Sequence, residues 1–299
     1  MRKSSLILTA KSFMFEIWHS KVFILFMGLV LVLGLTTFAR ASVGIAWHRW
    51  DAPNCDIYYW DGSTTTQISH NASAHNMFPS LYNGQIAWQV GFYNNYDIYY
   101  WNGSTVAQIT DNGGPHNQHA SLYNGQIAWG YLEIYYWDGS TITQISGGLH
   151  PSLYNGQIAW EGRVGDVWDI YFWDGSTITQ ISGSLHGLSH HPSLHNGQIA
   201  WHQYTGWEQP IYFWDGSTIT QITDYWNGDP YTNNNASLHN GQIAWSGDQH
   251  IYFWDGSTIT QISDDNAIGN SYPSLYNGQI AWQGYDGNDY EIYFWDGST

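Results

Sequence analysis

Basic side chains are nearly absent from this chain outside its first 41 residues. Of its seven Lys and Arg residues, five lie in that leader, and only Arg49 and Arg163 follow it. Two basic residues against 23 acidic ones give the remainder a net charge near −21. Binding to nucleic acid or to an anionic membrane requires Lys and Arg to replace the counterions of phosphate groups. Nucleic acid and anionic membrane surfaces are therefore excluded as partners.

Cysteine is equally scarce, because Cys55 is the single thiol among 299 residues. One cysteine forms no disulfide within its chain, so packing must hold an exported fold together. We expect Cys55 to be a buried or merely tolerated thiol. The sequence also lacks the G-x-S-x-G motif that marks the nucleophile of a propeller-linked serine peptidase.

The first 41 residues have the order of a secretory signal peptide. Arg2 and Lys3 precede an apolar run at 22–38, and Ala39-Arg40-Ala41 supplies a small-x-small cleavage site. We therefore predict a signal peptide at residues 1–41, a single domain at 42–299, and an exported protein in the periplasm, outside the cell or on its surface. The alternative is an uncleaved membrane anchor, because a run of 17 residues is just long enough to span a bilayer.

Seven near-copies of one sequence motif, the phrase of the repeat, fill the chain from residue 45 to its end. In the last copy the phrase reads P-S-L-Y-N-G-Q-I-A-W from Pro273 to Trp282 and E-I-Y-F-W-D-G-S-T from Glu291 to Thr299. A fixed period of about 40 residues indicates a repeat architecture. Four expected strands recur, which we name A (P-S-L-Y), B (Q-I-A-W), C (I-Y-F-W) and D (T-I-T-Q-I-S).

Two kinds of glycine turn join these strands. Asn-Gly joins A to B, as at Asn83-Gly84, and Asp-Gly joins C to D, as at Asp174-Gly175. Both dipeptides suit the type I′ turn of a two-residue hairpin, so each repeat is expected to be two hairpins in series. Strand C is apolar at every position, so both of its faces must be covered, as they are in the radially stacked blades of a propeller.

The chain ends lack parts of the repeat. The first copy has Ser42-Val43-Gly44 in place of strand A, and the last copy stops at Thr299 before strand D. We therefore predict an all-β propeller of about seven four-stranded antiparallel blades, the first without strand A and the last without strand D. The alternative is a fragment of a longer array. We expect a monomer.

The lengths of the connections separate the two faces of the predicted disc. The distance from the strand A Ser to the strand B Trp is 8 residues in all six complete copies, and that from the strand C Ile to the strand D Ile is 11 in all six. The B–C links vary from 5 to 10 residues and the D–A links from 7 to 15. One face is therefore uniform, and the varied face carries the candidate binding loops.

The repeat resembles the blade of TolB-like propellers. Their pattern of a proline before the inner strand, a glycine turn, I-A-W, I-Y and a late D-G turn appears here at Pro192-Ser193-Leu194, Asn196-Gly197, Ile199-Ala200-Trp201, Ile211-Tyr212 and Asp215-Gly216. The resemblance covers residues 45–299 and extends to bacterial propellers built from nearly identical blades. The W-D dipeptide is similar to that of WD-repeats in architecture only, because their G-H signature is missing. The resemblance implies a propeller fold and leaves function open.

Aromatic residues in the varied loops are the candidate ligand-binding residues. Mixed with Asn, Asp, Gly and His, such rings give contact area at low entropy cost, and their faces also suit sugars. The alternative is a structural role, in which about half of these rings simply cover the ends of the blades. The candidates are Trp50, Tyr93, Tyr96, Tyr131, Trp168, Tyr204, Trp207, Trp226, Tyr231, Tyr285 and Tyr290.

These observations favour a non-enzymatic propeller that binds a protein or a carbohydrate through its B–C and D–A loops. A structural cell-surface repeat protein is the alternative, followed by a carboxylate-dependent enzyme acting on glycosides, because acidic residues also occupy these loops. No catalytic residue, cofactor or metal is predicted. Loop histidines such as His119, His190 and His191 lack a metal-site spacing and are taken as solvated side chains. The segment from Asp286 to Glu291 looks like a calcium loop but does not fit the EF-hand spacing.

Overall fold

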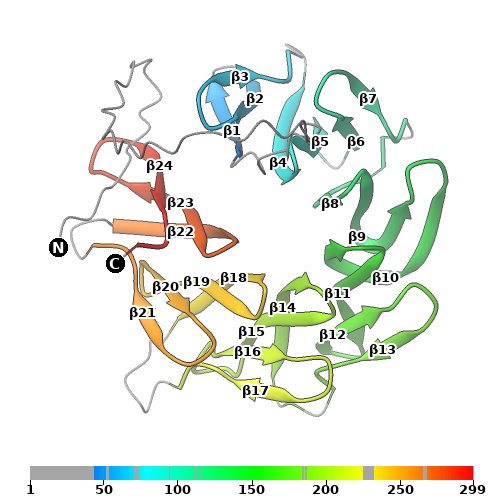
Figure 1. Ribbon diagram of the computed structural model, residues 1–299. Coiled ribbons are helices and arrows are strands. Elements are labelled where there is room, and N and C mark those ends of the chain that lie inside the picture. Colours follow the sequence, from blue (N-terminus) through cyan, green and yellow to red (C-terminus); the bar gives the residue numbers. More distant parts are fainter. Residues whose placement is uncertain are drawn as a thin grey trace, which may run out of the picture.

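The computed structural model describes residues 44–298, apart from 52–53, 71–73, 94, 112, 115, 184, 186, 225–231 and 265–267. Every regular element in this part of the chain is a β-strand, and the strands form antiparallel sheets arranged in a ring (Figure 1). The prediction of an all-β propeller is confirmed. The predicted signal peptide lies outside the described residues and stays a prediction. Among the described residues, no helix is long and apolar enough to span a membrane.

Three sheets have the expected four strands, in the order A to D from the centre outward. The second repeat forms β4 (His75–Tyr82), β5 (Gln85–Phe92), β6 (Asn95–Trp101) and β7 (Val106–Gln108). The fifth repeat forms β14 (Leu188–His195), β15 (Gln198–Tyr204), β16 (Ile211–Trp214) and β17 (Ile219–Gln221). The sixth repeat forms β18 (Asn233–His239), β19 (Gln242–Gly247), β20 (His250–Trp254) and β21 (Ile259–Gln261).

The two end sheets have three strands each. The first repeat forms β1 (Ile45–Asp51), β2 (Asn54–Trp60) and β3 (Thr65–Gln67). The last forms β22 (Ile268–Tyr276), β23 (Gln279–Tyr285) and β24 (Tyr290–Trp295). Within residues 44–298, the first blade thus shows no strand A and the last no strand D, as predicted. Between the described parts of these two blades no strand pairing joins β24 to β1 or β3.

The described chain has six blades, so the prediction of seven is wrong. The third and fourth repeats share one six-stranded sheet, made of β8 (Ser121–Tyr123), β9 (Gln126–Trp137), β10 (Ile142–Tyr154), β11 (Gln157–Val164), β12 (Val167–Trp173) and β13 (Ile178–Gln180). Their links are the shortest in the chain, so strands B and C run together as β9, and strand D continues into strand A as β10. Leu149 of β10 pairs with Tyr131 on one side and with Glu161 on the other.

The Asn-Gly turns match the prediction, whereas the Asp-Gly turns do not. Asn83 and Gly84 have φ values of 47° and 72°, as a type I′ turn requires. At the other turn, Asp174 is not among the residues with positive φ, and its backbone N–H donates to the Thr177 carbonyl at 3.2 Å. The Asp174 carboxylate accepts the N–H groups of Ser176 and Thr177. The C–D connection is therefore a four-residue loop held by its aspartate side chain.

Repeated contacts join each blade to the next. The hydroxyl of the strand A serine accepts the backbone N–H of the next strand A leucine, as from Leu194 to Ser152 at 2.9 Å. A ring of strand C also meets the strand C tryptophan of the next blade, as Phe172 meets Trp214 at 5.5 Å between centroids. The strand B tryptophans Trp88, Trp129, Trp160, Trp201 and Trp245 are at most 1% exposed. Most of the aromatic content is therefore structural.

Candidate functional site

The predicted aromatic residues are distributed over five blades. Of the nine in the described part, Trp50, Tyr93, Tyr131, Tyr204, Trp207 and Tyr290 are exposed, and Tyr96, Trp168 and Tyr285 are half-buried. Among the nine, the structure records ring contact for one pair, Tyr285 and Tyr290, whose centroids lie 5.4 Å apart. Trp226 and Tyr231 lie outside the described residues. For all eleven aromatic candidates, a role in ligand binding stays a prediction.

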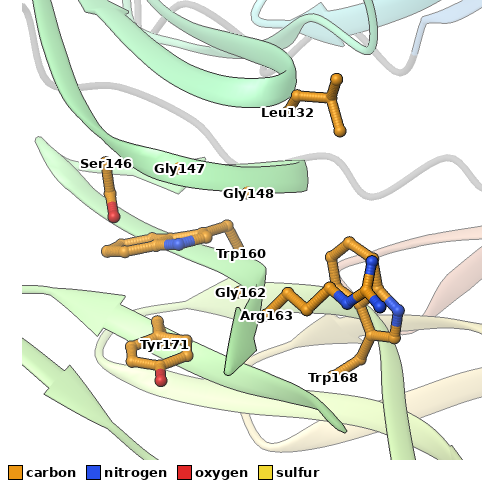
Figure 2. Close-up of a pocket in the computed structure, with 9 residues that line it drawn as sticks. All are labelled: Leu132, Ser146, Gly147, Gly148, Trp160, Gly162, Arg163, Trp168 and Tyr171. Atoms are coloured by element: carbon orange, nitrogen blue, oxygen red, sulfur yellow. The ribbon is translucent and has the colours of Figure 1, made fainter. Parts of the chain in front are cut away.

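One predicted residue, Trp168, lines a cavity of about 450 Å³ (Figure 2). The cavity lies where the third and fourth repeats share their sheet, on the varied face. Figure 2 shows Trp160 between β10 and the Tyr171 ring, with Arg163 and Trp168 side by side at one end. The lining consists of Leu132, Ser146, Gly147, Gly148, Trp160, Gly162, Arg163, Trp168 and Tyr171. Its volume is in the range of small-molecule sites.

A substitution within the repeat leaves a buried donor at this cavity. Four repeats place an asparagine four residues before the strand A serine, and its side chain accepts the strand B indole N–H, as Asn76 does from Trp88 at 3.0 Å. Gly148 occupies this position in the fourth repeat. The Trp160 Nε1 is consequently buried without a hydrogen-bond partner in the described structure. A Cβ added at Gly148 would lie 2.3 Å from the Trp160 ring, so this backbone approach requires glycine.

Arg163 brings positive charge to the mouth of the cavity. Its guanidinium lies 5.8 Å from the centre of the Trp168 ring and donates to the Gly165 carbonyl and to Asp166. Arg163 and Asp166 are both exposed, so their ion pair is weak and leaves the arginine accessible. The cavity therefore combines an aromatic wall with one cation in an otherwise acidic chain.

A second group of residues belongs to or just precedes the inner strands of the blades, which lie toward the centre of the ring (Figure 1). The residue two places before each strand A serine has a positive φ between 49° and 55°. These residues form what we call the axial row: Phe78, His119, His150, His191, Asn235 and Tyr272. Within the row, the ring centroids of His119 and His150 lie 4.4 Å apart, as do those of His150 and His191.

The fourth and fifth repeats place a buried carboxylate against this row. Glu161, in β11, is 1% exposed. Its carboxylate interacts with His150 Nδ1 at 2.7 Å and His190 Nδ1 at 3.0 Å, and it accepts the backbone N–H of His191 at 2.7 Å. The ring of His202, in β15, lies 5.3 Å from that of His191, and its Nδ1 is buried without a partner in the described structure. We call His150, Glu161, His190, His191 and His202 the His–Glu cluster.

The environment lowers the pKa values of Glu161 and of several histidines around it, for different physical reasons. Burial would raise the pKa of Glu161, but hydrogen bonds from His150 and His190 hold it well below its usual range. Burial lowers the pKa of His202 to about 3 and that of the neighbouring His119 to about 4. Burial also lowers the pKa of His191. At neutral pH, Glu161 is therefore a carboxylate, and His119, His191 and His202 are neutral imidazoles.

Sequence reasoning did not find this cluster. It placed His190 and His191 in a loop, whereas both lie in β14, and it did not single out His150, Glu161 or His202. One signal was available, because the residue after the strand B tryptophan changes from Gln89 to Glu161 to His202 between copies. The segment from Asp286 to Glu291, which only resembles a calcium loop, is closed by Asp286, whose carboxylate accepts the backbone N–H groups of Asn288 and Asp289. The carboxylates of Asp286, Asp289 and Glu291 lie within 4.8 Å of one another.

No protein-family model matches the chain, and no curated protein matches it significantly. Solved structures of similar shape include the β-propeller domain of the Trilobed protease from Pyrococcus furiosus, described as having an open velcro topology. It is 12% identical, with a TM-score of 0.65, and the match covers 85% of this chain and 90% of that one. At such identity the likeness shows the fold alone.

Two further matches are peptidases. Pyrococcus horikoshii acylaminoacyl peptidase is 14% identical with a TM-score of 0.60, and the match covers 82% of this chain and 47% of that one. A puromycin-hydrolyzing peptidase from Mycobacterium tuberculosis is 12% identical with a TM-score of 0.58, and the match covers 82% and 49%. The chain thus spans about half the length of these peptidases.

These matches bear on the predictions made from the sequence. The propeller is supported, whereas the finer resemblance to TolB-like or WD-repeat propellers is not shown. The prediction of a non-enzymatic scaffold for a protein or carbohydrate ligand is contradicted, because the similar structures are mostly propeller domains of peptidases. That the chain is not an enzyme stays a prediction.

Proposed function

We propose that this propeller serves a peptidase, as the part that holds a peptide substrate beside a catalytic domain. The observation that carries the proposal is the cavity at Trp168, which lies on the varied face and joins an apolar wall to a single cation. A peptide offers apolar side chains to such a wall and carbonyl or terminal carboxylate oxygens to an arginine. The likeness of the fold to peptidase propellers suggests the substrate class.

The strongly acidic chain sharpens this expectation. Arg163 is one of two basic residues after the leader, so the cavity is one of few places where a carboxylate would meet an attractive charge. Leu132 is 56% exposed and lies across the cavity from Trp168 (Figure 2), which gives an apolar side chain two surfaces to contact. We therefore expect short peptides with an apolar last residue to bind best. The repeat pattern also leads us to propose kinship with TolB-like propellers.

Calorimetric titration with N-acetyl-Gly-Gly-Phe and with its C-terminal amide tests the binding step. We expect both to bind, and Trp168→Ala to weaken them about tenfold or more, because it removes a hot-spot ring worth roughly 1–2 kcal/mol or more. Arg163→Gln should weaken the free acid more than the amide if the terminal carboxylate is bound, and both equally if a carbonyl is bound. Trp207→Ala is the matched control, since Trp207 is 81% exposed on the next blade. Equal losses in Trp168→Ala and Trp207→Ala would contradict the cavity as the site.

The link to a peptidase needs a separate measurement. The wild-type chain can be cross-linked to its neighbours in the native source and recovered, and the recovered material assayed for hydrolysis of the same peptide amide. We expect peptide hydrolysis to be enriched over a mock recovery without the chain. If the chain binds the peptide but the recovered material shows no such enrichment, the peptide site stands and the association with a peptidase is overturned.

A further inference from the structure

We propose that His150, Glu161 and His191 bind a divalent cation of the zinc class at the centre of the ring. One ligand atom from each of the three lies within 4.8 Å of the others. His150 Nδ1 and His191 Nε2 lie 2.7 Å and 3.8 Å from the same Glu161 oxygen. Zn²⁺ binds imidazole nitrogen and carboxylate oxygen at about 2.0–2.2 Å, so small side-chain movements suffice to bring three donors onto one ion. This inference does not rest on the proposed peptide site.

Two more imidazoles enclose the same carboxylate and strengthen the assignment. His190 Nδ1 lies 3.0 Å from the second Glu161 oxygen, so it is placed to supply a fourth ligand or to orient the carboxylate. His202 is 7% exposed, its ring is 5.7 Å from that of His190, and its Nδ1 lacks a hydrogen-bond partner in the described structure. A buried nitrogen without a partner is costly unless something fills its lone pair or takes its proton.

The chemistry of this donor set favours a borderline transition metal over calcium or magnesium. Imidazole is a ligand for zinc, copper and nickel, whereas calcium and magnesium prefer sites made of oxygen. One carboxylate with neutral imidazoles leaves a bound divalent ion with a net positive charge, and the acidic chain around it offsets that charge. Zn²⁺ is therefore the ion on which we base the test.

Comparison with another repeat shows that the fold does not require a charged residue at the position of Glu161. In the second repeat, the side-chain oxygen of Gln89 accepts the backbone N–H of His119 at 3.0 Å, as Glu161 accepts that of His191. A neutral glutamine is thus enough to cap the left-handed residue of the next blade. The negative charge of Glu161 and the histidines around it are not needed for this cap, and they are the features a cation would use.

The same comparison suggests substitutions that the fold should tolerate, because the introduced residues occur at equivalent positions in other repeats. Glu161→Gln introduces the residue that the second repeat has, and His191→Asn introduces the residue found at Asn235 in the axial row. Both should fold, which melting temperatures in the presence of a chelator will verify. His239→Tyr is the matched control, because the equivalent strand A positions hold Tyr154 and Tyr276, and the His239 ring contacts that of His195, which is not a member of the cluster.

The test is calorimetric titration of metal-free protein, carrying no polyhistidine tag, with ZnCl₂, together with elemental analysis of dialysed samples. We expect one tightly bound Zn²⁺ per chain that a large excess of Ca²⁺ or Mg²⁺ does not displace. Glu161→Gln and His191→Asn should each weaken it by roughly 100-fold or more, since loss of even an outer partner costs 10–100-fold. His239→Tyr should leave the affinity unchanged.

Two results would overturn the site. One is wild-type protein that retains no Zn²⁺ on dialysis; the other is a control variant that loses as much affinity as Glu161→Gln. Substitution with Co²⁺ gives a readout independent of affinity, because a tetrahedral nitrogen and oxygen site gives intense visible absorption. We expect that absorption in the wild type and in His239→Tyr, and its loss in His191→Asn. Its persistence in His191→Asn would exclude this residue as a ligand.

Discussion

The fourth and fifth repeats differ from the other complete blades in what their inner strands bury. In four repeats an asparagine carbonyl accepts the indole N–H of the strand B tryptophan, at distances from 2.8 to 3.1 Å. In the fourth and fifth repeats, Gly148 and Ser189 replace that asparagine, and Trp160 and Trp201 keep an indole N–H without a partner in the described structure. The copies are otherwise nearly identical.

These two exceptional repeats also hold the unusual chemistry. All five members of the His–Glu cluster belong to these two repeats, His150 and Glu161 to the fourth and His190, His191 and His202 to the fifth. The cavity is lined mainly by the fourth repeat, including Trp160 and Trp168. A regular repeat satisfies its buried indole N–H with its own asparagine. Where another residue replaces that asparagine, a buried polar atom is left without a partner in the described structure and is available to a ligand. The difference between copies is therefore a better guide to function than the shared phrase.

The largest expected effect is the loss of the asparagine from a regular blade. Asn233→Ala should lower the free energy of unfolding by about 3 kcal/mol, because it leaves the buried Trp245 N–H without its acceptor and opens a cavity. Ser189→Ala is the matched variant at the same repeat position and should change stability by less than about 1 kcal/mol, since the Ser189 hydroxyl has no partner in the described structure. Urea denaturation measures both, and equal losses would remove the distinction between the two kinds of blade.

The next effect concerns pH and the buried histidine of the fifth repeat. Burial lowers the folded-state pKa of His202 to about 3, against an unfolded value near 6.5. Between these values the unfolded chain binds one more proton, so stability falls as the pH falls from 6.5. His202→Gln, the residue found at Gln89, should lose about 2 kcal/mol less than the wild type between pH 7 and pH 5. Urea midpoints at the two pH values, with a chelator present, check this; parallel curves would refute it.

The smallest expected effect comes from repairing an exceptional blade. Ser189→Asn restores the acceptor that Trp245 and Trp88 have in their own blades and should raise the free energy of unfolding by about 1 kcal/mol. Thermal and urea denaturation both report it. A loss of stability would mean that the space beside Trp201 is already closed by packing in the fifth repeat.

Much of the fold was predictable because it depends on local pattern. The alternation of strands and turns, the type I′ geometry at Asn83-Gly84 and the missing strands at both ends follow from the order of residues within one copy. The C–D loop was mispredicted because the Asp174 side chain, rather than a positive φ at the aspartate, closes it. The shared sheet was missed because the short links were counted as loops, although Leu149 pairs on both sides.

The sequence by itself determined a ring of near-identical antiparallel blades with a uniform and a varied face. The exclusion of nucleic acid and anionic membranes, inferred from its lack of basic residues, stays a prediction. Only the tertiary structure decided that His150, Glu161 and His191 meet, because they lie in different strands of two adjacent blades. Their distance depends on how one blade packs on the next, which no local pattern encodes. Pairing within the shared sheet, rather than packing between blades, brings Leu132, Gly148 and Trp168 around one cavity.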